Sequence, residues 1–294
     1  MTKPGVVFRL LLLGLCSLVL VPWQMLALRF GWSSMLHRLP VWFHRALLKI
    51  FNVRVIERGT PPTDAPTIVL SNHVSWLDIP VIGSLHPLSF IAKSEIEGWP
   101  VVGLFARLQR SVFIDRQRRK ATAEVNDALA HRLVKGEVIV LFAEGTTSDG
   151  NRLLPFRSSL VGAAQTALMH DSVERVFLQP LAIAYTGRNG LPVTRRERPF
   201  IAWYGDMDLA PHLKLFVQGV PLDVVVTWGE PIPFNGNRKQ ATASAEAEVR
   251  RALKGLEAVH PRVASTPDAF ASSISQARKA ARAGRSAVAS GQTT

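Results

Sequence analysis

The chain has very little cysteine and comparatively little acidic charge. Its one cysteine, Cys16, lies in an apolar run, which excludes a disulfide framework and a cysteine-based metal site. A reducing compartment is compatible with this composition. The 22 acidic residues are outnumbered by 35 lysines and arginines, which gives a formal net charge of +13. Such a surplus favours a polyanionic partner, either nucleic acid or an anionic membrane surface.

The overall composition favours the membrane over nucleic acid. Seven tryptophans and a hydrophobic share of 47% differ from the water-loving composition in which basic nucleic-acid binders usually carry their charge. No nucleic-acid-binding module can be identified either. The 294 residues are enough for one substantial core with helical additions at its ends. We therefore expect a lipid bilayer, and not nucleic acid, as the partner of the positive charge.

Charged residues are also absent from a long stretch near the N-terminus, between Arg9 and Arg29. This apolar run is nearly long enough to cross the core of a bilayer. Because Pro22 interrupts it, a kinked span and a re-entrant hairpin are both compatible with the sequence. A cleaved signal peptide is the alternative interpretation, but no small-residue cleavage site follows the run.

Residues 34–51 place apolar side chains at helical spacing with basic side chains between them. This pattern indicates a helix that lies in the headgroup region, where its cations face anionic lipid. A helix that packs into the core of the following domain is the alternative. The positive charge after Arg29 favours a cytoplasmic position for the main domain. We expect residues 1–51 to form N-terminal membrane-anchoring helices.

From residue 51 onward, short apolar runs rich in β-branched residues alternate with helical patterns. Continuous hydrophobic strands separated by helices predict an α/β domain over residues 52–260, with a largely parallel sheet flanked by helices. The basic segment 261–294 has almost no large apolar residues, and we expect it to be disordered. The expected strands are residues 53–57, 67–71, 88–92, 111–114, 138–143, 176–185 and 223–228, and the expected helices are residues 76–84, 95–107, 119–134, 158–170 and 238–259.

Polar side chains follow three of these expected strands. His73 and Asp78 come after the second strand, Arg116 after the fourth and Glu144 after the fifth. Because ligands bind beyond the carboxyl ends of the strands in open α/β sheets, we expect these groups to meet at one edge. Each group alone has an ordinary structural explanation, such as a helix cap, a solvated helix start or the exit from a strand. Their convergence favours a catalytic site.

Four ordered motifs resemble those of the lysophosphatidate and glycerolipid acyltransferase family. The segment Asn72-His73-Val74-Ser75-Trp76-Leu77-Asp78 is similar to the first motif, NHxxxxD, and residues 112–116, 142–146 and 176–182 are similar to the other three. The resemblance implies acyl transfer from acyl-CoA or acyl carrier protein to a lipid hydroxyl, on the cytoplasmic face of the membrane. It implies that no metal or other cofactor is needed.

The motifs also suggest roles for single residues. His73 would deprotonate the acceptor hydroxyl, and Asp78 would fix the tautomer of His73 and stabilise its imidazolium form. A serine nucleophile is less attractive, because Ser75 lies on no G-x-S-x-G turn. The residues expected to bind the acceptor are Arg116, Glu144, Gly145, Thr146 and Thr147, supported by Asn72, Arg152 and Arg157.

One residue departs from the pattern of the family. Lysophosphatidate enzymes commonly read EGTRS in the third motif, whereas this chain has Thr147 in place of the arginine. Without that guanidinium the site lacks the group best suited to bidentate phosphate recognition. Together with residues 148–158 and 203–207, this makes the chain similar to bacterial lyso-ornithine lipid acyltransferases, whose acceptor carries no phosphate. Arg152 or Arg157 could still supply a phosphate contact.

The sequence therefore predicts a membrane-associated O-acyltransferase whose acceptor is lyso-ornithine lipid. Lysophosphatidate is the alternative acceptor. A non-catalytic lipid-binding protein of the same fold is a further alternative, but such a protein has no need of the intact pair His73 and Asp78.

Overall fold

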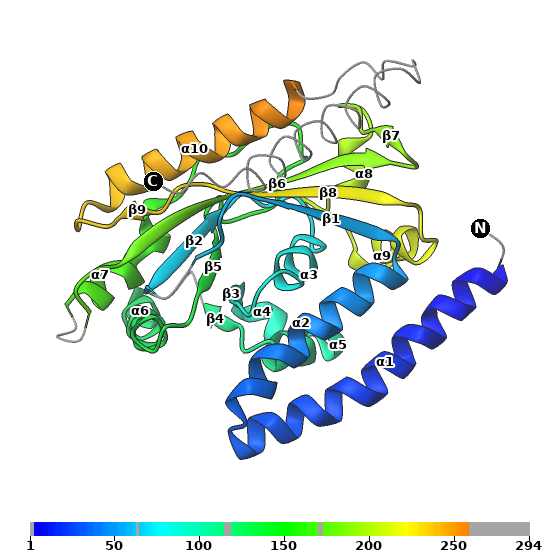
Figure 1. Cartoon of the computed structure of the whole chain (residues 1–294), viewed down its shortest axis with the longest axis horizontal. Helices are drawn as coiled ribbons and strands as arrows, with labels where there is room; N and C mark the ends of the chain where they lie inside the picture. The colour runs from blue at the N-terminus through cyan, green and yellow to red at the C-terminus, as the bar shows by residue number, and fades with distance from the viewer. Residues whose placement is uncertain (1–2, 63–64, 115–118, 170–172, 259–294) are drawn as a thin grey trace, which may run out of the picture. The chain divides into compact units, whose positions relative to one another are not determined.

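A single mixed sheet runs through the α/β body of the computed structural model, which describes residues 3–62, 65–114, 119–169 and 173–258 (Figure 1). Neighbouring strands are parallel along the whole path except where β8 meets β6, so the prediction of a largely parallel sheet is confirmed. The order is β1 (Val53–Arg58), β8 (Leu222–Trp228), β6 (Phe177–Arg188), β2 (Thr67–Ser71), β5 (Ile139–Phe142), β3 (Ser89–Lys93) and β4 (Val112–Ile114), and β7 (Leu191–Pro192) and β9 (Ile232–Pro233) pair with β6.

The central strands are largely apolar because helices cover both faces of the sheet. Every residue of β2 is buried, and alternate side chains point to opposite faces. Val69 belongs to a core that includes α3 (Asp78–Gly83), whereas Ile68 and Leu70 belong to a second core. The second core is covered by α6 (Arg119–Val134), α7 (Gly162–Leu168) and α10 (Arg238–Ala258).

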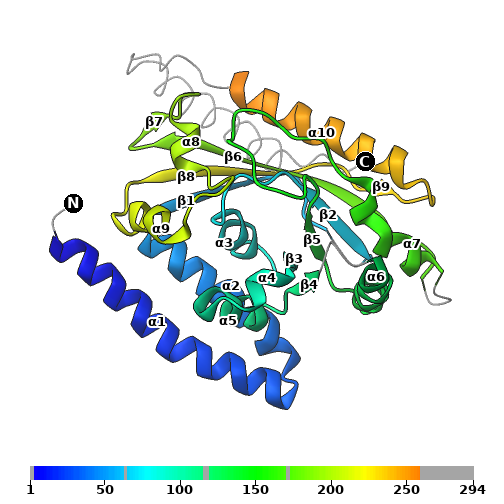
Figure 2. The ribbon, with the colours of Figure 1, turned by 180° about the vertical axis from the view of Figure 1, so that it is seen from behind.

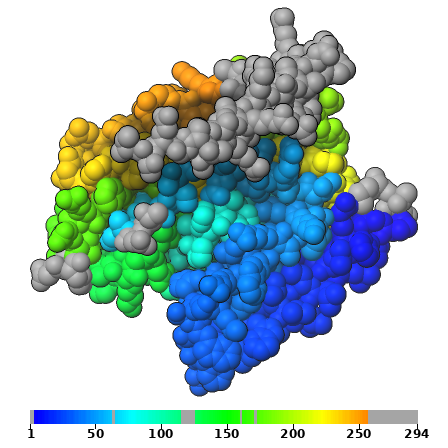
Figure 3. All heavy atoms as spheres, in the orientation of Figure 1, coloured from blue at the N-terminus to red at the C-terminus, as the bar shows by residue number. Residues whose placement is uncertain are grey.

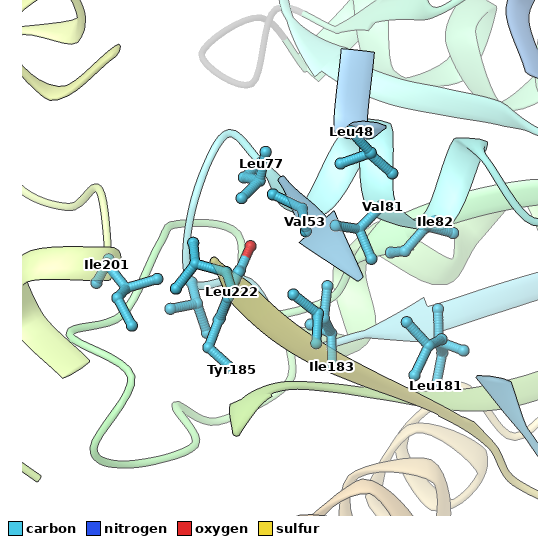
Figure 4. Close-up of a cluster of buried hydrophobic side chains, with 14 of the residues drawn as sticks. Leu48, Val53, Leu77, Val81, Ile82, Leu181, Ile183, Tyr185, Ile201 and Leu222 are labelled. Carbon is cyan, nitrogen blue, oxygen red and sulfur yellow. The ribbon is translucent and has the colours of Figure 1, made fainter. Parts of the chain in front are cut away.

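The first core connects the sheet with helices from distant parts of the sequence. Figure 4 shows Val81 and Ile82 of α3 together with Leu181 and Ile183 of β6. Leu48 comes from the N-terminal part of the chain, and Tyr185 brings a hydroxyl group into the cluster. The turn between β2 and α3, which contributes Val74 and Leu77, therefore rests on a packed apolar base.

The N-terminal residues form a helical hairpin along one side of the body, visible in both ribbon views (Figures 1 and 2). Its helices are α1 (Lys3–Phe30) and α2 (Ser33–Ile50). Pro22 is accommodated inside the continuous helix α1. Within the described residues, α1 is the single helix that is long and apolar enough to cross a membrane.

The predicted helix at residues 34–51 is confirmed, but it packs into the core of the body as well as presenting a surface. Its side chains Leu39, Val41, His44 and Leu48 are buried, while Trp42 is exposed. The alternative of a core-packing helix therefore describes the inner face of α2. Of the basic residues in the pattern, Arg38, Arg45 and Lys49 are exposed while His44 is buried, so the sequence pattern only partly resembled that of an interfacial helix.

The other helices differ from the prediction in two respects. The expected helix at residues 95–107 is divided into α4 (Ser94–Glu97) and α5 (Pro100–Leu108), because Pro100 disfavours a helical conformation at Trp99. Helices α8 (Arg198–Ile201) and α9 (Leu209–Val217) were not predicted. The expected disordered tail lies outside the described residues, and the division into an anchor, a domain and a tail stays a prediction.

Candidate active site

The turn after β2 brings His73 and Asp78 together. Nδ1 of His73 lies 2.8 Å from Oδ2 of Asp78. The same carboxylate oxygen accepts the backbone N–H groups of Val74, at 2.7 Å, and Ser75, at 2.9 Å. Its other oxygen, Oδ1, accepts the hydroxyl of Tyr185 at 2.6 Å. Asp78 is 0% exposed, so these four donors replace the water that a carboxylate would otherwise require.

This arrangement decides which nitrogen of His73 can act as a base. Because a carboxylate oxygen faces Nδ1, that nitrogen carries the hydrogen of the neutral imidazole. The lone pair then resides on Nε2. The side chain of His73 is 16% exposed, while that of Asp78 is fully covered. An imidazole held in this tautomer beside a buried carboxylate can take a proton from a hydroxyl and remain stabilised as the imidazolium.

The turn after β5 lies against the same histidine. The ring of His73 stacks on that of Phe142, with 3.8 Å between centroids and 11° between planes. Phe142 is the last residue of β5 and pairs with Ser71 across the parallel ladder. The amide of Ser148 donates to the carbonyl of His73 at 2.9 Å. Two of the three strand ends predicted to meet are therefore joined directly.

The end of β4, which precedes Arg116, lies further from the ends of β2 and β5 than the sequence suggested. β4 is separated from β5 by β3, so it is not a direct neighbour of either other strand. Arg116, the predicted acceptor-binding cation, lies outside the described residues. Its role stays a prediction.

The predicted acceptor-binding residues of the third motif differ in exposure. Glu144 and Gly145 are buried, Thr146 is exposed and Thr147 is half-buried. Gly145 has a φ of +74°, a left-handed conformation that favours glycine in this tight turn. Thr146 and Thr147 are therefore the members of the set that an acceptor can reach without rearrangement.

The supporting residues have more varied surroundings. Asn72 is buried, and its side-chain amide bonds both the carbonyl of Ile183, at 3.0 Å, and its N–H, at 2.9 Å. These contacts hold the turn against β6 and use both polar groups of the Asn72 amide, so Asn72 is suited to position the turn. Arg152 and Arg157 have exposed side chains, and the backbone N–H of Arg157 donates to the carbonyl of Ala143 at 2.8 Å.

Glu144 is unusual because its carboxyl group is buried close to His73 and Asp78. Only 2% of the residue is exposed, and this burial raises its pKa to about 8, with further contributions from the negative charges of Asp78 and Glu246. The backbone amides of His73 and Leu154 lower the pKa by a smaller amount. The carboxyl group is therefore mainly protonated at neutral pH, which keeps a second negative charge away from Asp78.

This burial makes the stability of the protein depend on pH. Native Glu144 keeps its proton up to about pH 8, whereas the unfolded chain releases it near the ordinary value of 4.5. Its contribution to stability is complete below that value and is lost as the pH rises through about 8. Glu144→Gln should therefore gain stability relative to the wild type with rising pH, by up to about 1 kcal/mol per pH unit. Urea unfolding of both proteins at several pH values measures this, and a constant difference would contradict it.

Sequence reasoning missed Tyr185 as a member of the site. Burial and the neighbouring Asp78 raise the pKa of its phenol well above the ordinary value, so it stays protonated and donates. The alternation of side chains along β6 could have indicated this position. Leu181 pairs with Ser71, the last residue of β2, and alternate residues of β6 place Tyr185 beyond that end on the same face.

The residues described by the structure contain no group of three or more histidine, cysteine, aspartate or glutamate side chains that could hold a metal ion. The turn itself offers an imidazole, a buried carboxylate that binds it and a set of backbone hydrogen bonds. Such a group of residues can activate a hydroxyl for attack on an ester-like carbonyl.

Comparison with known proteins identifies the family. The sequence model described as "Acyltransferase" matches residues 52–184. The lyso-ornithine lipid O-acyltransferase of Brucella abortus (strain 2308) is 44% identical over 242 residues, which are 81% of this chain and 90% of that protein. The enzyme of the same name from Rhizobium meliloti (strain 1021) is 42% identical over 248 residues, 83% of this chain and 84% of that protein.

A solved structure has the same fold. The crystal structure of the 1-acyl-sn-glycerophosphate (LPA) acyltransferase PlsC from Thermotoga maritima aligns with a TM-score of 0.59 and 21% identity, over 89% of this chain and 100% of that one. Three observations agree on the family. They are the four motifs in order, the paired histidine and aspartate at the end of a parallel strand, and the relatives that cover most of the sequence. The chain belongs to the acyltransferase family and is an acyltransferase.

Proposed function

We propose that this enzyme transfers a fatty acyl group from an acyl thioester to the hydroxyl of lyso-ornithine lipid, which gives ornithine lipid. The observation that carries the proposal is the 44% identity with a lyso-ornithine lipid O-acyltransferase over 81% of the chain. Thr147 supports it, because it is half-buried and directly precedes Ser148, whose amide binds the carbonyl of His73. A residue without charge thus lies next to the base, where lysophosphatidate enzymes commonly have an arginine.

The reaction follows from the tautomer of His73. Nε2 takes the proton of the lipid hydroxyl while the oxygen attacks the carbonyl carbon of the thioester. Asp78 stabilises the resulting imidazolium through Nδ1, at 2.8 Å. The carbon–sulfur bond then breaks, and the imidazolium returns its proton to the departing thiolate. The products are an ester and a free thiol, and the thioester is reactive enough for positioning and one base to suffice.

The proposed acyl donor is acyl carrier protein or coenzyme A loaded with a fatty acyl group. Both occur in the cytoplasm, which together with the net charge of +13 supports a position on the cytoplasmic face of the inner membrane.

A side-by-side assay of the purified enzyme tests the acceptor. One acyl donor is supplied with either lyso-ornithine lipid or lysophosphatidate, and the esters are quantified. We expect the larger kcat/KM with lyso-ornithine lipid. A larger value with lysophosphatidate would overturn the proposal and favour the phosphate-bearing acceptor.

Thr147→Arg should shift this preference. A guanidinium at this half-buried position can form a charge-assisted, bidentate contact with a phosphate, worth about 1.5–3 kcal/mol. We expect the ratio of kcat/KM for lysophosphatidate to that for lyso-ornithine lipid to rise by roughly tenfold or more. Thr146→Arg, at the exposed neighbouring position, is the control and should change the ratio less. An unchanged ratio in Thr147→Arg would remove this residue as a determinant of acceptor choice.

The hairpin of α1 and α2 supports binding in the plane of one leaflet instead of a transmembrane span. Nε of Arg9 donates to the carbonyl of Ile50 at 2.8 Å, and a terminal nitrogen of Arg9 donates to that of Gln218 at 2.9 Å. Fifteen residues along, Gln24 donates to the carbonyl of Leu108 at 2.8 Å. A helix that keeps both contacts stays alongside the body, which supports in-plane binding.

The other face of α1 is apolar and open. Leu11, Leu15 and Leu18 are all exposed, Leu18 to 73%, and the space-filling view shows the helix as an outer edge of the molecule (Figure 3). An exposed apolar face of this extent on a helix with basic neighbours is typical of an interfacial anchor.

Replacing two of these leucines by charge should weaken membrane binding. In Leu15→Glu/Leu18→Glu the apolar area that enters the lipid is lost at two positions, each worth about 1.5–3 kcal/mol. We expect binding to vesicles containing anionic lipid to fall by at least about a hundredfold in a sedimentation assay. The control is Leu191→Glu on β7, which is 68% exposed but lies on another part of the molecule. Equal losses in both proteins, or no loss in the double variant, would contradict in-plane anchoring by α1.

A further inference from the structure

Trp76 lies in the middle of the catalytic turn, between His73 and Asp78, and the proposed reaction gives it no task. Its indole N–H donates to Nδ1 of His212 at 3.0 Å. His212 belongs to α9, which is 136 residues further along the chain. This hydrogen bond connects the turn to α9, a helix that lies outside the four sequence motifs.

The indole is also held by two aromatic rings. Phe51, directly after α2, meets it edge-on with 6.3 Å between centroids and an interplanar angle of 89°. Phe216 of α9 meets it at 5.3 Å and 79°. Edge-to-face contacts fix the plane of a ring, while the hydrogen bond fixes its rotation within that plane. Trp76 therefore has one defined orientation.

His212 is suited to accept this hydrogen bond because it is kept neutral. It is 2% exposed, and burial lowers its pKa. The backbone carbonyls of Ala202, Phe200 and Ile201 have the opposite but smaller effect on the pKa. Since Nδ1 accepts the indole hydrogen, the hydrogen of the imidazole is on Nε2, which is buried and has no hydrogen-bond partner within the described residues.

The same region of the chain contacts the turn a second time. The backbone N–H of Trp203, just after α8, donates to the carbonyl of Val74 at 2.9 Å. The amide of Val74 in turn donates to Asp78. The residues from α8 to α9 thus support the turn at Val74 and at Trp76, once through the backbone and once through the side chains of Trp76 and His212.

We propose that His212 is a positioning residue for acyl transfer, which holds the turn through Trp76 so that His73 and the amides of Val74 and Ser75 face Asp78 together. Four intervening residues separate His73 from Asp78, and a rotation of the turn at Trp76 would move the imidazole relative to its carboxylate. A displacement of about 1 Å in a catalytic group can lower the rate by about 10²-fold. This inference rests on the base role of His73 in the proposed function, but not on the identity of the acceptor.

A matched pair of variants tests the proposal. Leucine and asparagine have nearly the same shape, and the oxygen of asparagine can replace Nδ1 as acceptor for Trp76. We expect His212→Leu to lower kcat by roughly 10- to 100-fold with KM for donor and acceptor within about twofold of the wild type. His212→Asn should keep kcat within about threefold, because the hydrogen bond is retained.

Trp76→Phe is a second variant for the same test. It removes the indole N–H that donates to His212 and keeps an aromatic ring between Phe51 and Phe216. It should resemble His212→Leu, and the double variant should lose no more than either single one, because all three lack the same hydrogen bond. Thermal unfolding confirms that each protein is folded. If His212→Leu does not fold, Trp76→Phe alone carries the test.

Three outcomes would overturn the proposal: full activity in folded His212→Leu or Trp76→Phe, equal losses in the leucine and asparagine variants, or a change confined to KM. His73→Ala serves as the reference in the same assay. If His73→Ala is active, the proposed reaction itself fails. If it is inactive while His212→Leu is fully active, only the positioning role fails.

Discussion

His73→Ala should lower kcat for acyl transfer by about 10²–10⁴-fold, the range that a positioned general base contributes. The residue's Nδ1 is bound to Asp78, which leaves Nε2 as the nitrogen proposed to take the proton of the acceptor. Its side chain is partly exposed and lies over the ring of Phe142, outside the two apolar cores, so we expect the variant to fold. The rate is measured as release of free thiol from the acyl donor in the presence of acceptor.

A second histidine provides the control for this experiment. His86 also pairs with a carboxylate, that of Glu57 at 2.7 Å, but it lies outside the turn between β2 and α3. His86→Ala should retain the activity of the wild type, and both variants should unfold within a few degrees of it. Near-normal turnover by folded His73→Ala would show that another group is the base.

The second large effect concerns Asp78, whose charge and hydrogen bonds can be separated by two substitutions. In Asp78→Asn the amide oxygen can accept the three N–H groups that Oδ2 accepts now, and the amide nitrogen can face the hydroxyl of Tyr185. The fold is then retained while the negative charge beside the imidazolium is lost. We expect kcat to fall by roughly 10²–10⁴-fold, with a small change in Tm.

Asp78→Ala should lose stability as well as activity. The N–H groups of Val74 and Ser75 and the hydroxyl of Tyr185 would then be buried without an acceptor, at about 1–3 kcal/mol each. For a domain of this size we expect Tm to fall by roughly 10 °C or more. Calorimetry of the two variants beside the wild type measures this difference. An asparagine variant as unstable as the alanine variant would mean that the charge, and not the hydrogen bonds, holds the turn.

The parts of the fold that the sequence predicted are those with strong local signals. β2 could be located because its five residues are all apolar or small and are followed at once by a polar turn. His73 and Asp78 were found since both lie within that one turn, where the hydrogen bond between them spans five residues. The largely parallel sheet followed from the alternation of such strands with helices.

The parts that were missed depend on contacts between distant segments. Tyr185 reaches Asp78 across 107 residues, and His212 reaches Trp76 across 136. The order of strands in the sheet, which places β3 between β5 and β4, is likewise fixed by packing and not by neighbouring residues. Patterns within a segment say which face is apolar, but they do not say which other segment covers it, as the inner face of α2 illustrates.

The two contacts that hold α1 against the body also fix the height of the body relative to the membrane. If α1 lies in one leaflet, the body cannot rise or sink relative to the lipid without breaking the contacts of Arg9 and Gln24. His73 then stands at a constant level above the acyl chains, and a lipid is acylated only if its hydroxyl reaches that level. The enzyme would then select its acceptors by the depth of the hydroxyl in the bilayer as well as by the charge of the headgroup.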